Sequence, residues 1–518
     1  MNLREHFALV TFDPSILMQL RSTTLYPLLL LLLLPLSGWA QEDHIDTTQA
    51  VQILQQAEQR GEARYGVSVW RIDEDKPLLD YRSRERFTPA SVTKIFSSAT
   101  ALIALGADYQ FPTEIGYRGD ITNDGVLKGD LIIVGHGDPS LESKHYPRRK
   151  GIFYEQVYLA LQQAGIRQIR GRIIVDASAY CDEGYLDVWP REDWGRRYAP
   201  AVYGVNLCDN IMQVGISAQE VAKGAKAPTF LHPSTPGHAW QMDIQLVKRG
   251  RLLAISADRN SRTTRRLSGR LVRGSSKRQV IACDLSNPAM ALALQLAEHL
   301  QQRGIELTDC QSVAYYDKSA PALTTLLDIY LSPHLSELIR TCNYHSVNLY
   351  AEALLRSIGN RFGSVQQGGC ISTSEALRQE MNYWRETCSL SANELELYDG
   401  SGLSPRSKLS PYALTAALRQ VYRLPLPLSD PFILSLPQVG REGTVRKLLS
   451  ASQLTAYFKS GSIRGVQNYA GYVSYNGHTY CVSLLANDMR HRGTTRRTMT
   501  QVLEALFPNS PTTRASNL

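Results

Sequence analysis

Cysteine is scarce in this sequence, with eight among 518 residues. That density excludes a small scaffold held together by disulfides. No two cysteines form a C-x-x-C pair, and none has the spacing to histidine that zinc sites show, so the sequence indicates no metal and no other cofactor. Hydrophobic residues make up 43% and charged residues 20%, which excludes disordered, collagen-like and coiled-coil proteins. The length predicts about three globular domains.

Long apolar runs are almost absent too, and the one exception lies near the start. Residues 25–36 are mainly leucine, and the small residues Gly38 and Ala40 follow them. This pattern predicts a signal peptide over residues 1–40, and therefore export to the periplasm or another extracytoplasmic space. An uncleaved anchor is the alternative, and Met18 would make a more conventional start than the first residue. No second segment is long and apolar enough to span a membrane.

The positive charge of the chain is local. The formal net charge is +8, but residues 248–278 alone contain eleven basic residues and one acidic residue. This basic stretch, which begins at Lys248 and ends at Arg278, is either a solvated face or a contact for an anionic cell-wall or membrane surface. It contains no aromatic residue on which a base could stack, so nucleic acid is not an expected partner.

A buried helix is predicted at residues 91–105, because this segment is almost wholly apolar or small. A helix and a strand are expected before it, and a β-rich region of short alternating segments after it, over residues 109–280. The last part is expected to be helical and to end with three strands and a helix. The expected elements are helices at 47–60, 287–303, 332–342, 346–358, 372–388, 410–423 and 494–507, and strands at 65–72, 455–460, 468–475 and 478–487.

Ser91 and Lys94 form an S-x-x-K pattern at the start of the buried helix. Residues three apart share one helix face, so the Lys94 amine is expected beside the Ser91 hydroxyl. Burial disfavours the charged form of a lysine, which lowers its pKa and lets it act as a base. The residues by themselves therefore indicate an activated serine with a buried lysine partner.

Two further motifs follow in the chain. Ser346 and Asn348 form an S-x-N pattern, which alone would be read as a serine that caps a helix. Lys459, Ser460 and Gly461 form a K-S-G pattern at a predicted strand, which alone would be read as a turn. The three motifs together, in this order, are typical of penicillin-recognising serine enzymes.

The chain resembles the low-molecular-mass class C penicillin-binding proteins, the D-Ala-D-Ala carboxypeptidase/endopeptidase family. Besides the three motifs, the resemblance rests on residues 135–141 (GHGDPSL), 399–404 (DGSGLS) and 440–444 (GREGT). It implies an α/β (α+β) fold in which a transpeptidase/β-lactamase-like domain, an antiparallel sheet flanked by helices, is interrupted by two nested β-rich inserted domains. The 251 residues between Lys94 and Ser346 leave room for such an insertion.

The resemblance also implies domain boundaries. The catalytic domain would comprise residues 41–108 and 319–518. The second domain would comprise residues 109–185 and 281–318, and the third residues 186–280. The pairing of the eight cysteines does not follow from their positions.

The resemblance implies a serine DD-peptidase that acts on peptidoglycan stem peptides and is acylated by β-lactams. Ser91 would attack the carbonyl of the penultimate D-Ala, and Lys94 would take the serine proton. Ser346 would pass a proton to the leaving amine, and Asn348 would hold Lys94 and the substrate amide.

The third motif would bind the substrate. Lys459, Ser460 and Ser462 would face its carboxylate, with Gly461 between them in the chain. The backbone N–H groups of Ser91 and Ser462 would form the oxyanion hole. Two alternatives remain: a β-lactamase, for which no clear glutamate-bearing loop is visible, and a cell-wall-binding scaffold with a relic site.

Overall fold

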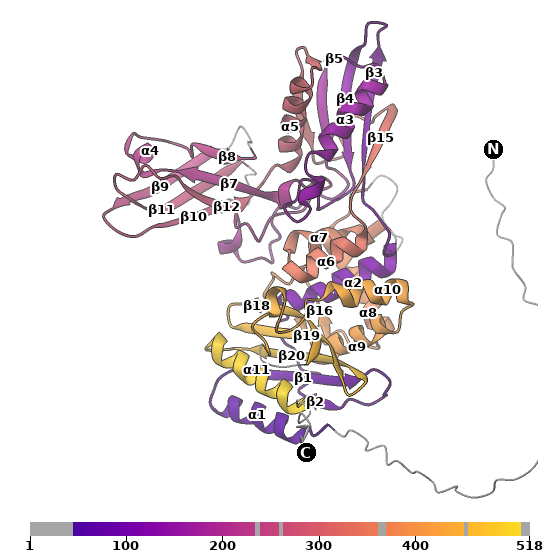
Figure 1. Cartoon of the computed structure of the whole chain (residues 1–518), viewed down its shortest axis with the longest axis vertical. Helices are drawn as coiled ribbons and strands as arrows, with labels where there is room; N and C mark the ends of the chain where they lie inside the picture. The colour runs from indigo at the N-terminus through magenta and orange to yellow at the C-terminus, as the bar shows by residue number, and fades with distance from the viewer. Residues whose placement is uncertain (1–44, 234–238, 258–262, 361–368, 450–453, 509–518) are drawn as a thin grey trace, which may run out of the picture. The chain divides into compact units, whose positions relative to one another are not determined.

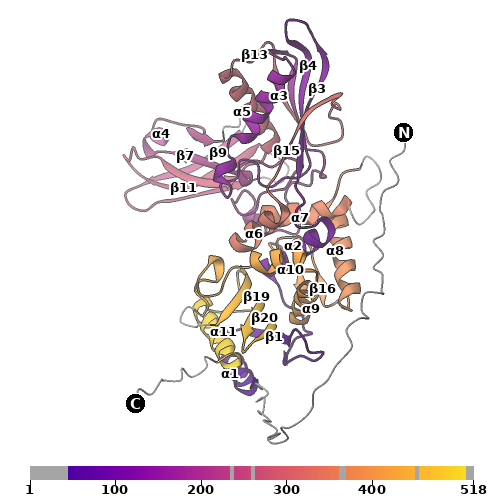
Figure 2. The ribbon, with the colours of Figure 1, turned by 45° about the vertical axis from the view of Figure 1, so that its right-hand side comes forward.

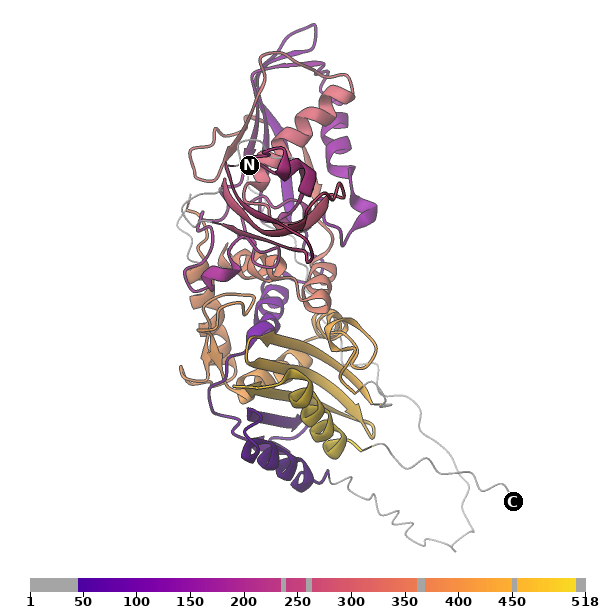
Figure 3. The ribbon, with the colours of Figure 1, turned by 90° about the vertical axis from the view of Figure 1, so that its left-hand side faces the viewer.

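A five-stranded antiparallel sheet joins the two ends of the described chain (Figure 1). The computed structural model describes residues 45–233, 239–257, 263–360, 369–449 and 454–508, so the expected signal peptide lies outside the described residues. The strand order is β18 (Thr455–Ile463), β19 (Val466–Tyr475), β20 (His478–Asn487), β1 (Arg64–Arg71) and β2 (Leu79–Tyr81). Helices α1 (Thr48–Gln59) and α11 (Arg492–Leu506) share a core with this sheet, and Figure 3 shows α11 along its face.

A helical layer forms a second core with the other face of the sheet. Its helix α2 (Lys94–Leu105) consists mainly of apolar and small residues, and its first nine residues are buried. In Figure 1 and Figure 2 this helix lies between the sheet and the inserted strands. The other helices of the layer are α6 (Leu335–His345), α7 (Asn348–Ser357), α8 (Thr373–Thr387), α9 (Pro411–Tyr422) and α10 (Leu426–Ser435), and a short pair β16 (Leu395–Glu396) and β17 (Lys408–Leu409) accompanies them.

The inserted region, residues 112–331, contains a seven-stranded mixed sheet and two smaller sheets. The seven-stranded sheet consists of β3 (Pro112–Ile121), β4 (Val126–Gly135), β5 (Gln168–Arg170), β6 (Arg172–Asp176), β13 (Glu306–Leu307), β14 (Gln311–Tyr315) and β15 (Thr325–Leu331). The smaller sheets consist of β12 (Gln279–Asp284), β7 (Ile211–Ile216) and β8 (Phe230–His232), and of β10 (Leu252–Ala257), β11 (Thr264–Val272) and β9 (Ala239–Val247). The helices of the region are α3 (Ile152–Gln163), α4 (Ala218–Ala222) and α5 (Pro288–Gln302). The mixed architecture and the inserted sheets confirm the expected fold class.

Three local differences from the sequence expectations have physical causes. Helix α3 lies within the segment expected to be β-rich, because Phe153, Val157 and Leu161 are buried at helical spacing. Helix α10 was not expected, since two prolines and few polar residues mask its pattern. Strand β15 pairs with β3, so we place the return from the inserted region after Leu331 rather than after residue 318.

The basic stretch is only partly a free surface. Arg265 is fully buried and forms an ion pair of 3.0 Å with Asp284, and Arg266 forms one of 2.7 Å with Asp243. Residues 258–262 of the stretch lie outside the described residues. The charge available to an anionic partner is therefore smaller than the sequence count.

Within the described ranges, no helix combines the length and the apolar character needed to cross a membrane.

Candidate active site

Lys94 lies inside the protein in direct contact with Ser91. Ser91 belongs to a single 3₁₀ turn (Ala90–Thr93), and Lys94 follows as the first residue of α2. The fully buried Nζ of Lys94 donates to Ser91 Oγ at 3.0 Å, to Asn348 Oδ1 at 2.6 Å and to the Ser401 carbonyl at 2.6 Å. Burial lowers the pKa of Lys94 to about 8. The structure thus brings together a serine hydroxyl and an amine that can lose its proton near neutral pH.

Two buried carboxylates, Glu352 and Asp399, accept hydrogen bonds from the loop that contacts Lys94. Glu352 of α7 accepts from the backbone N–H groups of Gly400 at 3.1 Å and Ser401 at 2.9 Å. Burial, and then the charge of Asp399, raises the pKa of Glu352 to about 7. These contacts direct the Ser401 carbonyl toward Lys94. Sequence reasoning missed Glu352, although an acidic residue in the apolar helix α7 was a usable signal.

Ser346, which is half-buried, and Lys459, which is fully buried, form a second pair. Lys459 Nζ donates to Ser346 Oγ at 2.9 Å and to the Ser460 carbonyl at 2.7 Å. Burial, and then the charge of Lys94, lowers the pKa of Lys459 well below its ordinary value. Ser346 follows α6 with a left-handed backbone (φ of 57°), and α7 has Val347 as its N-cap. Ser346 therefore ends α6 and is not the N-cap of α7.

Strand β18 passes very close to the segment that contains Ser91, and Gly461 permits this close approach. A Cβ atom at Gly461 would lie 2.5 Å from the Pro89 carbonyl oxygen and 3.0 Å from the Ser91 nitrogen. Any side chain would push the strand and the serine apart. Glycine therefore lets Ser462 and the backbone of Ser91 border the same cavities.

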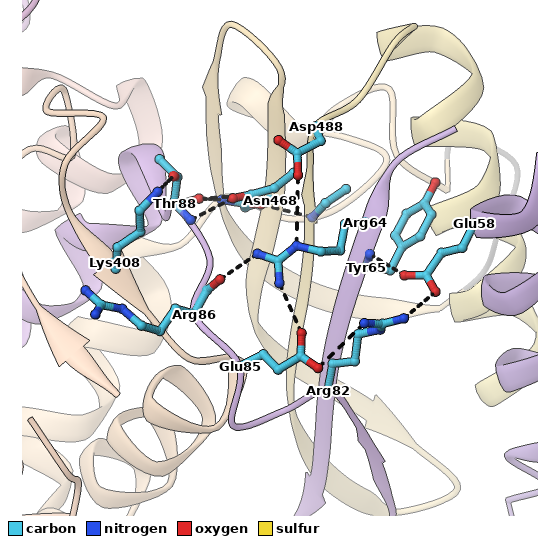
Figure 4. A network of polar contacts seen from close by, with 12 residues as sticks. Glu58, Arg64, Tyr65, Arg82, Glu85, Arg86, Thr88, Lys408, Asn468 and Asp488 are labelled. Carbon is cyan, nitrogen blue, oxygen red and sulfur yellow. Dashed lines mark hydrogen bonds and ion pairs between the residues drawn. The ribbon is translucent and has the colours of Figure 1, made fainter. Parts of the chain in front are cut away.

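A network of polar contacts fixes the chain that leads to Ser91 (Figure 4). Asn468 Nδ2 of β19 donates to the Thr88 carbonyl at 2.9 Å, and Lys408 donates to the Thr88 hydroxyl. Arg64 of β1 donates to the Arg86 carbonyl at 2.6 Å. The sheet and the loop before the helix are thus connected by hydrogen bonds, so the nucleophile has a defined position relative to β18.

Two cavities meet at Ser91, Ser346 and Ser462, which line both. The first has a volume of about 370 Å³ and is also lined by Ser460, Thr444 and four cationic side chains. The second has a volume of about 650 Å³ and is also lined by Asn348 and by residues of the inserted region. Neither lining includes Lys459 or Gly461. The placement of Lys459 therefore gives no support to its expected contact with the substrate carboxylate.

The inserted region completes the site in a way that no motif indicated. Asn348 Nδ2 donates to the Tyr198 carbonyl at 2.7 Å, and Trp189 Nε1 donates to buried Asp399 at 2.8 Å. A disulfide joins Cys181 to Cys370, 189 residues further along the chain. These contacts hold residues 181–198 against Asn348 and Asp399. Glu192 and Asp193, which follow Trp189, line the second cavity.

No group of three or more histidine, cysteine, aspartate or glutamate side chains in the described part of the chain is arranged to hold a metal ion.

A helix-flanked antiparallel sheet carries an S-x-x-K, an S-x-N and a K-S-G motif in this chain, and the structure brings their side chains into contact. The chain belongs to the D-Ala-D-Ala carboxypeptidase 3 (S13) family, whose model matches residues 47–506. It is a low-molecular-mass class C penicillin-binding protein, which confirms the resemblance inferred from its motifs, and a serine DD-peptidase.

Named relatives agree with this assignment. D-alanyl-D-alanine carboxypeptidase DacB of Haemophilus influenzae is 26% identical over 423 residues, which cover 78% of this chain and 81% of the relative. D-alanyl-D-alanine carboxypeptidase of Actinomadura sp. (strain R39) is 26% identical over 408 residues, which cover 75% and 71%. The crystal structure of penicillin binding protein 4 (dacB) from Haemophilus influenzae matches the fold with a TM-score of 0.71 and 21% identity, covering 88% of this chain and 97% of that one.

Proposed function

We propose that this protein is an exported enzyme that cleaves D-Ala-D-Ala termini and D-Ala cross-links of peptidoglycan through an acyl-enzyme on Ser91. The observation that carries the proposal is the 3.0 Å contact between Lys94 Nζ and Ser91 Oγ, at the meeting point of two cavities. Family membership supplies the substrate class. The Haemophilus penicillin binding protein 4 has also been solved with a β-lactam, which supports β-lactams as inhibitors of this chain.

In the first half of the reaction, neutral Lys94 takes the Ser91 proton while Ser91 Oγ attacks the carbonyl of the penultimate D-Ala. The negative charge that develops on the carbonyl oxygen is stabilised by the N–H groups of Ser91 and Ser462. The close approach at Gly461 supports this pairing of donors. Asn348 positions Lys94, because its Oδ1 accepts a hydrogen bond from Lys94 Nζ. The Nδ2 of Asn348 donates to the Tyr198 carbonyl.

In the second half, the tetrahedral intermediate collapses and the C–N bond breaks. Ser346 gives its proton to the leaving amine, and Lys459, in contact with Ser346 Oγ, supplies a replacement proton. Ser460 and Ser462 line the cavity where the leaving-group carboxylate would lie. Water then hydrolyses the Ser91 ester: its hydroxyl joins the acyl group of the released peptide, and its proton restores the Ser91 hydroxyl. The proton that Lys94 took during acylation returns to Lys459, so both amines recover their starting forms.

Export follows from the expected signal peptide and the cell-wall substrate, so the proposed location is extracytoplasmic. The basic stretch stays a candidate contact for an anionic wall or membrane surface. Its exposed residues, such as Arg270 and Arg273, would carry that contact, because Arg265 is buried in an ion pair.

The test is labelling with a fluorescent penicillin, followed by measurement of how fast the label is released. The wild type should form a slowly released adduct, and Ser91→Ala should form none while keeping its melting temperature. Ser374→Ala, an exposed serine of α8, is the matched control and should label normally. Fast release of the label would indicate a β-lactamase. Absence of any labelling would indicate a cell-wall-binding scaffold. A labelled Ser91→Ala protein would refute the assignment of the nucleophile.

A further inference from the structure

The first cavity at Ser91 is strongly cationic. Its lining includes four basic side chains and no carboxylate, and we call it the cationic cavity; the four are Arg446, Lys447, Arg492 and Arg496. The second cavity differs, since Glu192 and Asp193 line it together with Arg464. The two sides of the nucleophile therefore present opposite electrostatic environments to a substrate.

Two structural elements supply the four cations. Arg492 and Arg496 lie four residues apart at the start of α11, so they share one helix face and lie at its positive end. Arg446 and Lys447 follow the short turn Gly443–Val445. None of the four forms an ion pair with another residue of the described ranges. Neighbouring Arg497 differs, because it donates to Thr494 Oγ1 and does not line the cavity.

This arrangement does not stabilise the fold by itself. Four like charges around one cavity repel one another, and the repulsion is relieved when anions bind between them. The cavity also contains the Ser460 hydroxyl, which donates to Thr444 Oγ1 at 2.6 Å, and it opens onto Ser346. The leaving group departs next to Ser346, which lines both cavities, but Ser460, which we expect to face the leaving-group carboxylate, lines only the cationic cavity. We therefore assign the leaving group to the cationic cavity.

We propose that the cationic cavity binds a leaving group with several carboxylates, namely the second stem peptide of a cross-link. The inference rests on the proposed function and deepens it. A single D-Ala carries one carboxylate, which Ser460, Ser462 and one cation suffice to bind. A stem peptide released from a cross-link carries further carboxylates on the same group, and these match the remaining cations. The cavity therefore favours cleavage of cross-links over removal of terminal D-Ala.

The experiment compares kcat/KM for a cross-linked dimer with kcat/KM for a monomeric pentapeptide. The test variant combines Arg492→Gln with Arg496→Gln. The matched control combines Arg490→Gln with Arg497→Gln, two exposed arginines of the same region outside the cavity lining. Because hydrogen bonds to charged groups are strong, the dimer-to-monomer ratio should fall about 10–100-fold in the test variant. The control should keep the wild-type ratio, and added salt should lower the ratio of the wild type.

A second substrate isolates the carboxylates. Amidation of the carboxylates on the leaving stem should lower wild-type kcat/KM for the dimer by a similar factor, and should cost the test variant much less. Equal losses on dimer and monomer, or an undiminished amidation penalty, would overturn the proposal. If the double variant does not fold, Arg446→Gln with Lys447→Gln gives the same test.

Failure of this inference can be told from failure of the proposed function. Penicillin labelling and pentapeptide hydrolysis are measured on the same preparations of wild type. If both are absent, the proposed function is wrong. If both are present and the dimer-to-monomer ratio does not respond to the variants, only the proposed role of the cationic cavity is refuted.

Discussion

The pH dependence of acylation provides the most direct test of Lys94 as the base. Burial lowers the pKa of Lys94 from its ordinary 10.5 to about 8. At pH 7 about a tenth of the Lys94 amines would then be neutral, against about one in 3,000 for an ordinary lysine. The buried position thus increases the reactive form about 300-fold at neutral pH. Asp399 and Glu352 oppose this effect, since their negative charges favour the protonated lysine.

The assay is the second-order rate constant for acylation by a fluorescent penicillin, measured from pH 5.5 to pH 9.5. Only the neutral amine has a lone pair with which to take the Ser91 proton, so the rate constant should rise with pH. The increase should be about tenfold per pH unit below pH 7 and should end above about pH 9, because the free enzyme's base sets the profile. A flat profile between pH 6 and pH 9, or an inflection near pH 10, would refute the reasoning. The Ser374→Ala control should reproduce the wild-type profile.

Three other outcomes are expected. Glu352→Gln removes a negative charge that raises the pKa of Lys94, so the inflection of the acylation profile should move to lower pH; an unchanged or higher inflection would contradict the network. Gly461→Ala would place a Cβ atom 2.5 Å from the Pro89 carbonyl oxygen, so penicillin acylation should fall at least tenfold. Gly493→Ala, in helix α11 with open space around its Cβ position, should acylate normally. N-terminal sequencing of the exported protein should begin at Gln41, and retention of residues 18–40 would mean a membrane anchor.

The parts of the site that could be predicted are those that the chain encodes locally. The spacing of Ser91 and Lys94 sets their contact through helix geometry, and the apolar run around them indicates burial. The contact of Lys94 with Asn348 joins residues 254 positions apart, and only the resemblance suggested it. The secondary structure was predictable for the same reason. Strong hydrophobic periodicity predicted most helices and the last strands, whereas the weaker pattern of α3 did not indicate a helix.

What could not be predicted are contacts that depend on how distant segments pack. Arg492 and Arg496 look like ordinary surface residues of a terminal helix until the structure places them beside the nucleophile. The carbonyl of Tyr198 acts through the backbone, so its side-chain identity carries no signal. Trp189 is one aromatic residue among many in the sequence, and only packing brings it to Asp399.

The inserted region contributes to the candidate active site, because it contacts Asn348 and Asp399 and lines the second cavity. Trp189 donates to Asp399. Asp399 also accepts from the backbone N–H groups of Gly402 and Ser404, which follow the Ser401 carbonyl that accepts from Lys94. Removal of the region would leave Asp399 with one donor fewer, and a buried carboxylate that loses a donor costs about 1–3 kcal/mol. Removal of the region would also take away the Tyr198 carbonyl, which accepts from the Asn348 amide. The Asn348 side chain also positions Lys94, so its own position matters for the site. The surroundings of Lys94 are therefore built jointly by segments that lie 150 or more residues apart in the chain, with Tyr198 against Asn348 and Trp189 against Asp399.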